Sequence, residues 1–192
     1  HGNVYVAGTS QPCVFAKAGL DFNYNVRNLH SMRQLDVVKR LVIDDAQAPD
    51  VGVPMPAGAG TAADPVVVDA LPFTHHASTQ GSPSSVIDAY PGCNSAANES
   101  GPERFYRLTL TETTPIRAML FDREGVDVDL PLLSGGTTGA HCQARHDRLI
   151  ETTLGPGTYS FVVDSFTASG AVLSGEYTLV VMRCASSDAA CN

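Results

Sequence analysis

Residues 154–164 read Leu-Gly-Pro-Gly-Thr-Tyr-Ser-Phe-Val-Val-Asp, a turn followed by a run of β-forming side chains. Gly155, Pro156 and Gly157 make a tight turn, because proline fixes φ and glycine tolerates positive φ. Residues 158–163 then predict a strand, since β-branched and aromatic side chains suit a pleated, half-buried surface. The stretch is typical of an extracellular β-sandwich.

Similar strand signals recur through the C-terminal two-thirds of the chain. They cover residues 65–73, 103–110, 115–122, 126–133, 148–154, 158–164 and 175–183, with Gly/Pro or polar turns between them. Residues 74–85, which include His75 and His76, predict a Ser/Thr/Gly-rich loop. Short strands separated by frequent turns predict an all-β fold, an antiparallel two-sheet sandwich of jelly-roll or Ig-like type.

The organisation predicted along the chain has four parts. Residues 1–47 form an N-terminal appendage, with a strand near 2–9, a short helix near 29–36 and a strand near 37–44. Residues 48–65 are rich in Pro, Gly and Ala and predict a linker or extended arm. Residues 66–183 form the sandwich, and residues 184–192 a short tail. The N-terminal part is therefore an extended arm or a small α/β appendage.

Composition and charge exclude several classes of partner. The 192 residues have a formal net charge of −8 and a hydrophobic share of 43%, enough for a normal core. An acidic chain is unsuited to nucleic acids and anionic membranes, and the apolar runs are too short for membrane insertion. With no Trp and an aromatic share of 7%, a sugar- or base-stacking platform is disfavoured.

The cysteines and the first residue predict a secreted protein. The chain begins at His1, which indicates a processed mature protein or an excised fragment. Five cysteines suggest an oxidising compartment. Fifteen two-bridge pairings are formally possible; we favour a bond between Cys93 and Cys142, which pins two turns together, and one between Cys184 and Cys191, which closes the C-terminal tail. Cys13 is left over, as a buried free thiol or in an intermolecular bond, and we favour the thiol.

Four phrases of the chain, in their order and spacing, resemble the bacterial pre-peptidase C-terminal domain. They are residues 103–108 (ERFYRL), 126–130 (VDVDL), 155–159 (GPGTY) and 175–181 (GEYTLVV), and the resemblance covers about residues 66–182. It implies a β-sandwich accessory module of secreted peptidases and surface proteins, which is generally non-catalytic. Some such domains bind protein or carbohydrate, and some related collagen-binding modules use calcium. Residues 1–65 match no family that we recognise.

Four acidic residues crowd one turn and the strand that follows it. Asp122, Glu124, Asp127 and Asp129 suggest a calcium site, because alternate strand carboxylates point the same way and Ca²⁺ prefers oxygen ligands. The competing interpretation is that they are solvent-facing or turn residues, since their spacing is not that of an EF-hand. We favour the second interpretation and keep calcium as a hypothesis.

Histidines raise the question of a transition metal. In copper-dependent polysaccharide oxygenases, an N-terminal histidine chelates copper through its α-amine and imidazole, together with a second histidine nearby. His1 of this chain has the same two donor groups. The other candidates are His30, His75, His76, His141 and His146. His75 and His76 point apart on an extended chain, and a bridged Cys142 cannot join His141 in binding zinc.

Motifs of catalysis are missing from the sequence. It contains neither a Gly-x-Ser-x-Gly nucleophile elbow nor a phosphate-binding P-loop. Asn98-Glu99-Ser100 is a formal N-glycosylation sequon, which matters only in a host with that machinery.

Three functions are consistent with these patterns. The first is a secreted, non-enzymatic binding or assembly module of a bacterial extracellular or cell-surface protein, which recognises a polymer or protein through loops at one end. The second is a subunit of an extracellular fibre or surface layer, assembled when the 1–65 arm adds a strand to a neighbouring copy. The third is a copper enzyme that uses His1 to act on polysaccharide. We prefer the first.

Overall fold

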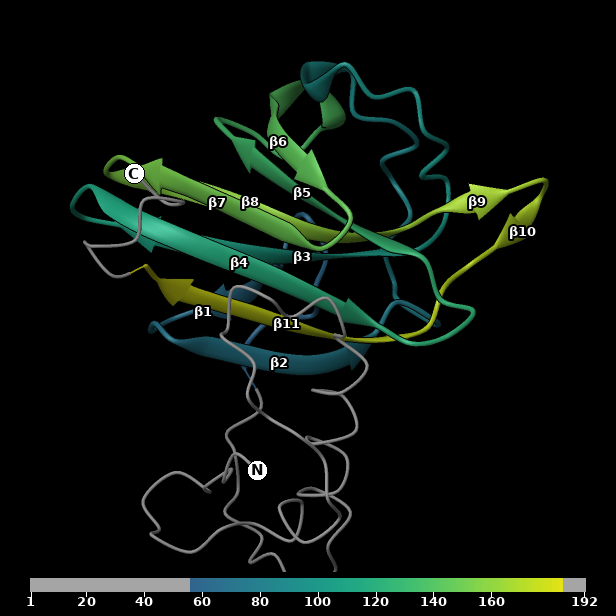
Figure 1. Ribbon diagram of the computed structural model, residues 1–192, viewed down its shortest axis with the longest axis horizontal. Helices are drawn as coiled ribbons and strands as arrows, with labels where there is room; N and C mark the ends of the chain where they lie inside the picture. The colour runs from purple at the N-terminus through teal and green to yellow at the C-terminus, as the bar shows by residue number, and fades with distance from the viewer. Residues whose placement is uncertain (1–55, 185–192) are drawn as a thin grey trace, which may run out of the picture. The chain divides into compact units, whose positions relative to one another are not determined.

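The computed structural model describes residues 56–184, in which the regular structure is all β apart from two single turns of 3-10 helix (Figure 1). The strands are β1 (Val66–Val68), β2 (Phe73–Ser78), β3 (Glu103–Leu110), β4 (Thr114–Asp122), β5 (Val128–Ser134), β6 (Cys142–His146), β7 (Leu149–Leu154), β8 (Gly157–Ser165), β9 (Thr167–Ala168), β10 (Ala171–Val172) and β11 (Glu176–Arg183). The 3-10 turns are η2 (Pro91–Cys93) and η3 (Gly139–His141). Within residues 56–184, no helix is long and apolar enough to cross a bilayer.

Two sheets form the body of the sandwich. One has the strand order β1-β3-β8-β5-β6 and the other β2-β11-β4-β7, while β9 and β10 form a small ribbon of their own. Neighbouring strands run antiparallel, except that the three-residue β1 runs parallel to β3. The predicted all-β, two-sheet sandwich is confirmed, with β1 as a parallel exception at one edge.

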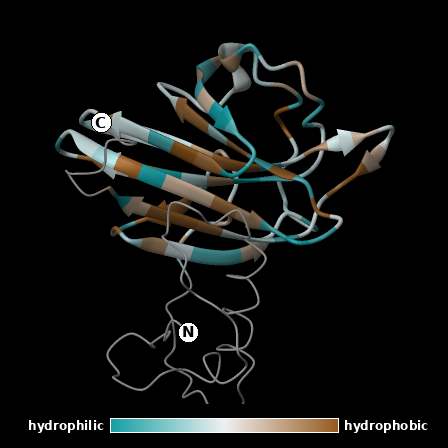
Figure 2. Cartoon of the chain, viewed as in Figure 1, coloured by the Kyte–Doolittle hydropathy of each residue, from teal (hydrophilic) through white to brown (hydrophobic). Residues whose placement is uncertain are grey.

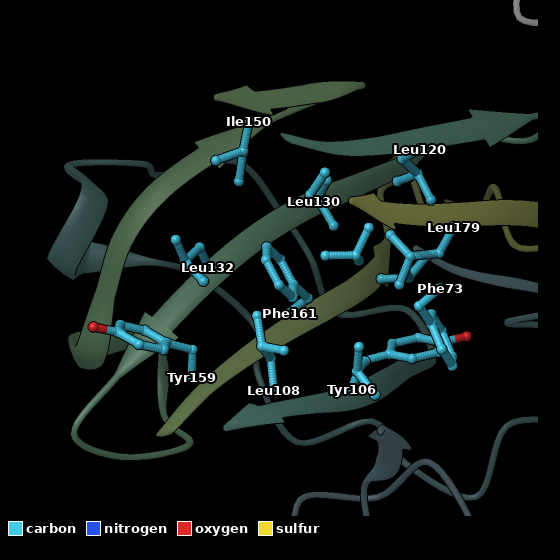
Figure 3. Packing of buried hydrophobic residues seen from close by; sticks show 14 of the residues in the cluster. Phe73, Tyr106, Leu108, Leu120, Leu130, Leu132, Ile150, Tyr159, Phe161 and Leu179 are labelled. Atoms are coloured by element: carbon cyan, nitrogen blue, oxygen red, sulfur yellow. The ribbon is translucent and has the colours of Figure 1, made fainter. Parts of the chain in front are cut away.

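The core lies between the facing surfaces of the two sheets. Side chains alternate along each strand, so Tyr159, Phe161 and Val163 of β8 point inward. Leu120 of β4 and Leu179 of β11 approach them from the opposite sheet (Figure 3). Figure 2 shows that apolar residues are concentrated in the strands of both sheets. This alternation is why the period-two patterns located β4, β8 and β11.

A second, smaller apolar cluster covers the outer face of the five-stranded sheet. Phe105, Val162 and Leu133 point outward from β3, β8 and β5, and they pack against Ile87 and Tyr90. The last two belong to residues 84–101, which we call the roof segment because it lies over this face. The five-stranded sheet is therefore buried on both sides where the roof segment covers it.

Four strands were not expected from the sequence: β2 and β6 in the two main sheets, and the two-residue β9 and β10 of the small ribbon. Residues 74–78 were predicted as loop but belong to β2, which pairs with β11 from Phe73 to Ser78. Residues 142–146 form β6 at the edge of the other sheet. Both are edge strands whose side chains are mostly partly exposed, so neither carries the apolar alternation of an interior strand.

Residues 56–65, the second half of the predicted linker, pack along the edge of the sandwich. Gly60 and Thr61 donate backbone hydrogen bonds to Asp64, and Gly60 accepts one from Phe105 at 2.9 Å. Gly58 has a φ of +108°, and a Cβ there would meet the Pro65 carbonyl oxygen at 2.1 Å. A turn, rather than a free tether, therefore precedes β1. The predicted appendage of residues 1–47 lies outside the described residues.

Candidate binding site

Two loops on the outer side of the five-stranded sheet line an open pocket with a cavity volume of about 380 Å³. One loop is residues 86–91 of the roof segment, and the other is residues 137–140 between β5 and β6. Ala62, from the turn before β1, completes the lining. The pocket is therefore built from three segments that are distant in the sequence.

A disulfide joins the two loops. Cys93 and Cys142 are bonded across a sequence separation of 49 residues, which confirms the predicted bridge. Cys93 ends η2 and Cys142 begins β6, so the bond ties the roof segment to the edge of the five-stranded sheet. Cys184 is also disulfide-bonded, but Cys191, its predicted partner, and Cys13 lie outside the described residues.

Two glycines let the loops approach each other closely. A Cβ on Gly92 would meet the Ala140 carbonyl oxygen at 2.5 Å, and one on Gly139 would meet the Ala89 carbonyl oxygen at 2.0 Å. Real Cβ atoms do not come so near to backbone oxygen, so these two positions require glycine. Together with the disulfide, the contacts hold the pocket walls in one geometry.

The pocket combines apolar walls with a few polar groups. Ile87 is buried in the second apolar cluster and forms part of the wall, whereas Val86 beside it is 67% exposed at the rim. Thr137, Thr138 and the exposed Asp88 supply hydroxyl and carboxylate oxygens. Such a lining suits a side chain with an apolar stem and a polar or cationic end.

The formal charge of the protein is concentrated in the sandwich part of the chain. Residues 56–192 contain seven arginines, no lysine and fifteen acidic residues, so the whole net charge of −8 lies there. Five of the arginines, at positions 117, 123, 145, 148 and 183, form ion pairs with acidic side chains. Because these pairs neutralise most of the cations, the remaining field is negative and favours a basic partner.

Three carboxylates form a row beneath the roof segment. Glu103 of β3 is paired in register with Asp164 of β8, and Asp164 is paired with Asp129 of β5. The three side chains point to the outer face of the sheet, and their residues are 0%, 0% and 3% exposed. We call Glu103, Asp129 and Asp164 the carboxylate row. The wholly buried Glu99 of the roof segment lies beside it.

The roof segment is fastened to this row by hydrogen bonds. The Glu103 carboxylate accepts from the Ser84 hydroxyl at 2.5 Å and from the Val86 amide at 2.8 Å. The Tyr90 hydroxyl donates to Asp164 at 2.5 Å. Arg145 of β6 bridges Glu99 and Asp129, each at 2.5 Å. The pocket wall formed by residues 86–91 is therefore attached to the sheet both through carboxylates and through the apolar packing of Ile87 and Tyr90.

Burial raises the pKa of two of these acids, Asp164 and Asp129. Loss of solvent raises the pKa of Asp164 to about 9; the Tyr90 hydrogen bond opposes this rise, and the charges of Glu103 and Glu99 add to it. Burial, followed by the hydrogen bond and charge of Glu99, raises the pKa of Asp129 against the effect of Arg145. These acids are too deeply buried to reach a substrate in solution.

The four residues of the calcium hypothesis are divided between the two sheets. Asp122 ends β4 and pairs with Arg148 at 3.2 Å, whereas Asp129 lies on β5 and pairs with Arg145. Glu124 and Asp127 lie in the intervening turn, where Glu124 is exposed. Across residues 56–184, no three His, Cys, Asp or Glu side chains are arranged to hold a metal ion. The geometry adds no support for calcium, which stays a prediction.

The described histidines do not converge on one site. His75 faces inward and its ring contacts the Tyr106 hydroxyl at 3.0 Å, while His76 faces outward and contacts Thr178 at 3.1 Å. These contacts confirm that the pair diverges, although it lies on β2 and not in a loop. His141 is bonded to Thr138 at the pocket, and His146 ends β6. His1 and His30 lie outside the described residues, so copper binding stays a prediction.

The sequon residue Asn98 is exposed in the roof segment. Its side-chain oxygen accepts from the Ser100 amide at 3.2 Å, and its carbonyl accepts from the Thr167 amide of β9. Glycosylation at Asn98 remains untested.

Sequence reasoning missed the pocket and most of the carboxylate row. Of the row, Asp129 was named, but as a metal ligand, while Glu103 and Asp164 were counted only as strand residues. Their outward positions in the alternating pattern are typical of solvent-facing residues. Three acids at outward positions of three strands are a signal only once the strand order is known.

Comparisons with known proteins find no family for this chain. No protein-family model matches the sequence, and no curated protein matches it. Among solved structures, the pre-peptidase C-terminal domain of collagenase from Bacillus anthracis is 14% identical with a TM-score of 0.38, over 58% of this chain and 89% of that domain. This is the domain family that the four sequence phrases resemble.

A second solved structure is a periplasmic inhibitor of g-type lysozyme, PliG from Aeromonas hydrophila. It is 11% identical with a TM-score of 0.40, over 62% of this chain and 94% of the inhibitor.

Proposed function

We propose that this protein is a secreted, non-enzymatic binding module that holds a basic partner protein at the pocket between residues 86–91 and 137–140. The observation that carries the proposal is the pocket itself, with its walls fixed by the Cys93–Cys142 disulfide and by Gly92 and Gly139. A rigid concave site loses little conformational entropy when it binds. A disulfide between loops also supports an oxidising, extracellular compartment.

The chemistry of the pocket favours a lysine side chain of the partner. Apolar wall residues such as Val86 and Pro91 suit the methylene stem, while Asp88 and the threonine hydroxyls suit the ammonium group. The formal net charge of −8 on residues 56–192 supports association with a basic protein. A polysaccharide is less suited, because the lining contains no aromatic side chain on which a sugar ring could stack.

A titration followed by amide chemical shifts tests this proposal. The probe is a tetralysine peptide added to the full chain at pH 6.5, and we expect shift changes centred on residues 86–91 and 137–140. The Asp88→Asn variant should bind about two- to fivefold more weakly, as expected for a partly exposed ion pair. Asp69→Asn, which removes an exposed acid outside the pocket, is the matched control.

Three outcomes of the titration would count against the proposal. One is the same response to a tetraglutamate peptide, which would remove the role of charge. Another is shift changes confined to residues outside the two loops. The third is equal weakening by the Asp88→Asn and Asp69→Asn substitutions.

The fibre and metal alternatives have their own tests. Strand donation by residues 1–65 predicts oligomers whose mass is read by light scattering, and a strict monomer argues against it. Metal analysis with and without His1 tests the copper enzyme, and calorimetric titration with CaCl₂ tests calcium at Asp122, Glu124, Asp127 and Asp129.

A further inference from the structure

The attachment of the roof segment to the sheet depends on groups that can gain or lose a proton. Seven titratable side chains face one another there: Tyr90 and Glu99 from the roof segment, Glu103 from β3, Asp129 from β5, Arg145 and Asp147 from β6 and the turn after it, and Asp164 from β8. Five of these groups are carboxyls, and Arg145 is the one cation in the set. All of the carboxyls except the exposed Asp147 are buried, and a single guanidinium cannot balance four buried carboxylates.

Two carboxylate oxygens of this cluster have no hydrogen-bond partner among the described residues. They are Oδ1 of Asp164 and Oε2 of Glu99, and both belong to side chains that are wholly buried. An ionised carboxylate with an unpaired oxygen is costly in such surroundings, whereas a protonated one is nearly neutral in charge. The closed arrangement is therefore suited to carboxyls that keep a proton.

We propose that the carboxylate row holds the roof segment closed only while it is partly protonated, so that a rise in pH opens the pocket wall. The inference rests on the proposed function in one respect: the pocket that opening would disrupt is the proposed binding site. The attachment of the roof segment to the sheet is made by residues of the chain itself and needs no ligand.

The part that moves follows from the geometry. When Asp164 loses its proton, a second negative charge appears beside Glu103, its register partner. The strands cannot separate without breaking the backbone ladder of the sheet. The roof segment is held by the side-chain contacts of Ser84 and Tyr90, by the packing of Ile87 and Tyr90, and by two backbone hydrogen bonds, from Glu103 to Ser84 and from Thr167 to Asn98. These contacts are fewer than the backbone bonds of the sheet ladder, so lifting the segment hydrates the new charge at a lower cost than separating the strands. The Cys93–Cys142 disulfide then keeps the segment tethered.

Hydrogen exchange of the full chain between pH 5 and 9, expressed as protection factors corrected for the intrinsic rate, tests the inference. The closed state keeps a proton on Asp164 up to a pKa of about 9, whereas the open state releases it in the ordinary carboxyl range. Each carboxyl that keeps its proton only in the closed state makes the equilibrium constant for opening rise about tenfold per pH unit between its open-state and closed-state pKa values. We expect the Val86 and Ile87 amides, which donate to Glu103, to lose protection at this rate.

Amides of β4 and β11 provide the internal control, because they belong to the other sheet. They should stay better protected than the roof amides at every pH. The Asp164→Asn variant, whose amide cannot ionise, should flatten the pH dependence of the roof segment by one proton, whereas Asp69→Asn should leave it unchanged. If Asp164→Asn does not fold, the wild-type profile decides alone.

Two results would overturn the inference. In the first, the roof amides keep a constant protection factor from pH 5 to 9. In the second, roof and sheet amides have the same protection at each pH, which means that they open only by unfolding the whole domain. Loss of tetralysine binding with an intact exchange profile would remove the proposed function and leave this inference standing.

Discussion

Gly139 lies so close to Ala89 that a Cβ at position 139 would meet the Ala89 carbonyl oxygen at 2.0 Å. The two residues are 50 positions apart in the sequence and belong to the two loops that wall the pocket. Their contact, together with the Cys93–Cys142 bond, holds the two walls of the pocket against each other while the roof segment is closed.

Replacing Gly139 by alanine should destabilise the protein by about 1–3 kcal/mol, because the added methyl group overpacks a backbone contact that cannot yield. Urea unfolding measures the change. Gly155→Ala is the matched control, since a Cβ there has no atom within 4 Å and the substitution should be neutral or slightly stabilising. Equal effects of the two substitutions would mean that the loops move apart freely.

Removing the disulfide with the double variant Cys93→Ser, Cys142→Ser should lower the free energy of unfolding by about 4 kcal/mol. The estimate is the chain entropy of closing a loop with this sequence separation of 49 residues. The bond at Cys184 is left in place. Denaturant titration gives the loss, and one well under 1 kcal/mol would show that the roof segment is held without the bond.

The buried tyrosine pair should respond unequally to loss of its hydroxyls. Tyr106 contacts both Tyr177, at 2.5 Å, and His75, at 3.0 Å. Tyr177→Phe leaves Tyr106 with His75, whereas Tyr106→Phe leaves the buried Tyr177 hydroxyl without that partner. We expect Tyr106→Phe to cost about 1–3 kcal/mol and Tyr177→Phe less, as measured by thermal unfolding. The reverse order would contradict this hydrogen-bond network.

Global stability should fall as the pH rises above the ordinary carboxyl range. Burial raises the pKa of Asp164 to about 9 in the folded state, so the folded protein holds a proton that the unfolded chain releases above about pH 4. Each such proton lowers the free energy of unfolding by about 1.4 kcal/mol per pH unit, and the loss levels off near pH 9.

Urea titrations at pH 5, 7 and 9 measure this slope, and Asp164→Asn should reduce it and stabilise the protein most at pH 9. Glu112→Gln, which removes an exposed acid paired with the exposed Arg183, is the control. A wild-type stability that rises from pH 5 to 9 would contradict the raised pKa of Asp164.

The sequence predicted the strands that carry a clean alternation. Residues 103–110 were located to the residue as β3, and the predicted strand at 158–164 corresponds to β8, Gly157–Ser165. Each of these strands places apolar side chains on the core face, so the pattern is local and strong. β2 and β6 were missed because an edge strand is wetted along much of its length and needs no such pattern.

Local pattern by itself determined which residues of the clean strands face the core, and it favoured a bond between the cysteine-containing turns at 93 and 142 among fifteen possible pairings. Only the tertiary structure decided that Glu103, Asp129 and Asp164 stand in one buried row, and that loops 50 residues apart line a pocket. The reason is physical. Alternation along a strand fixes the side on which a residue points, but what covers that side depends on strand order and on the path of the roof segment.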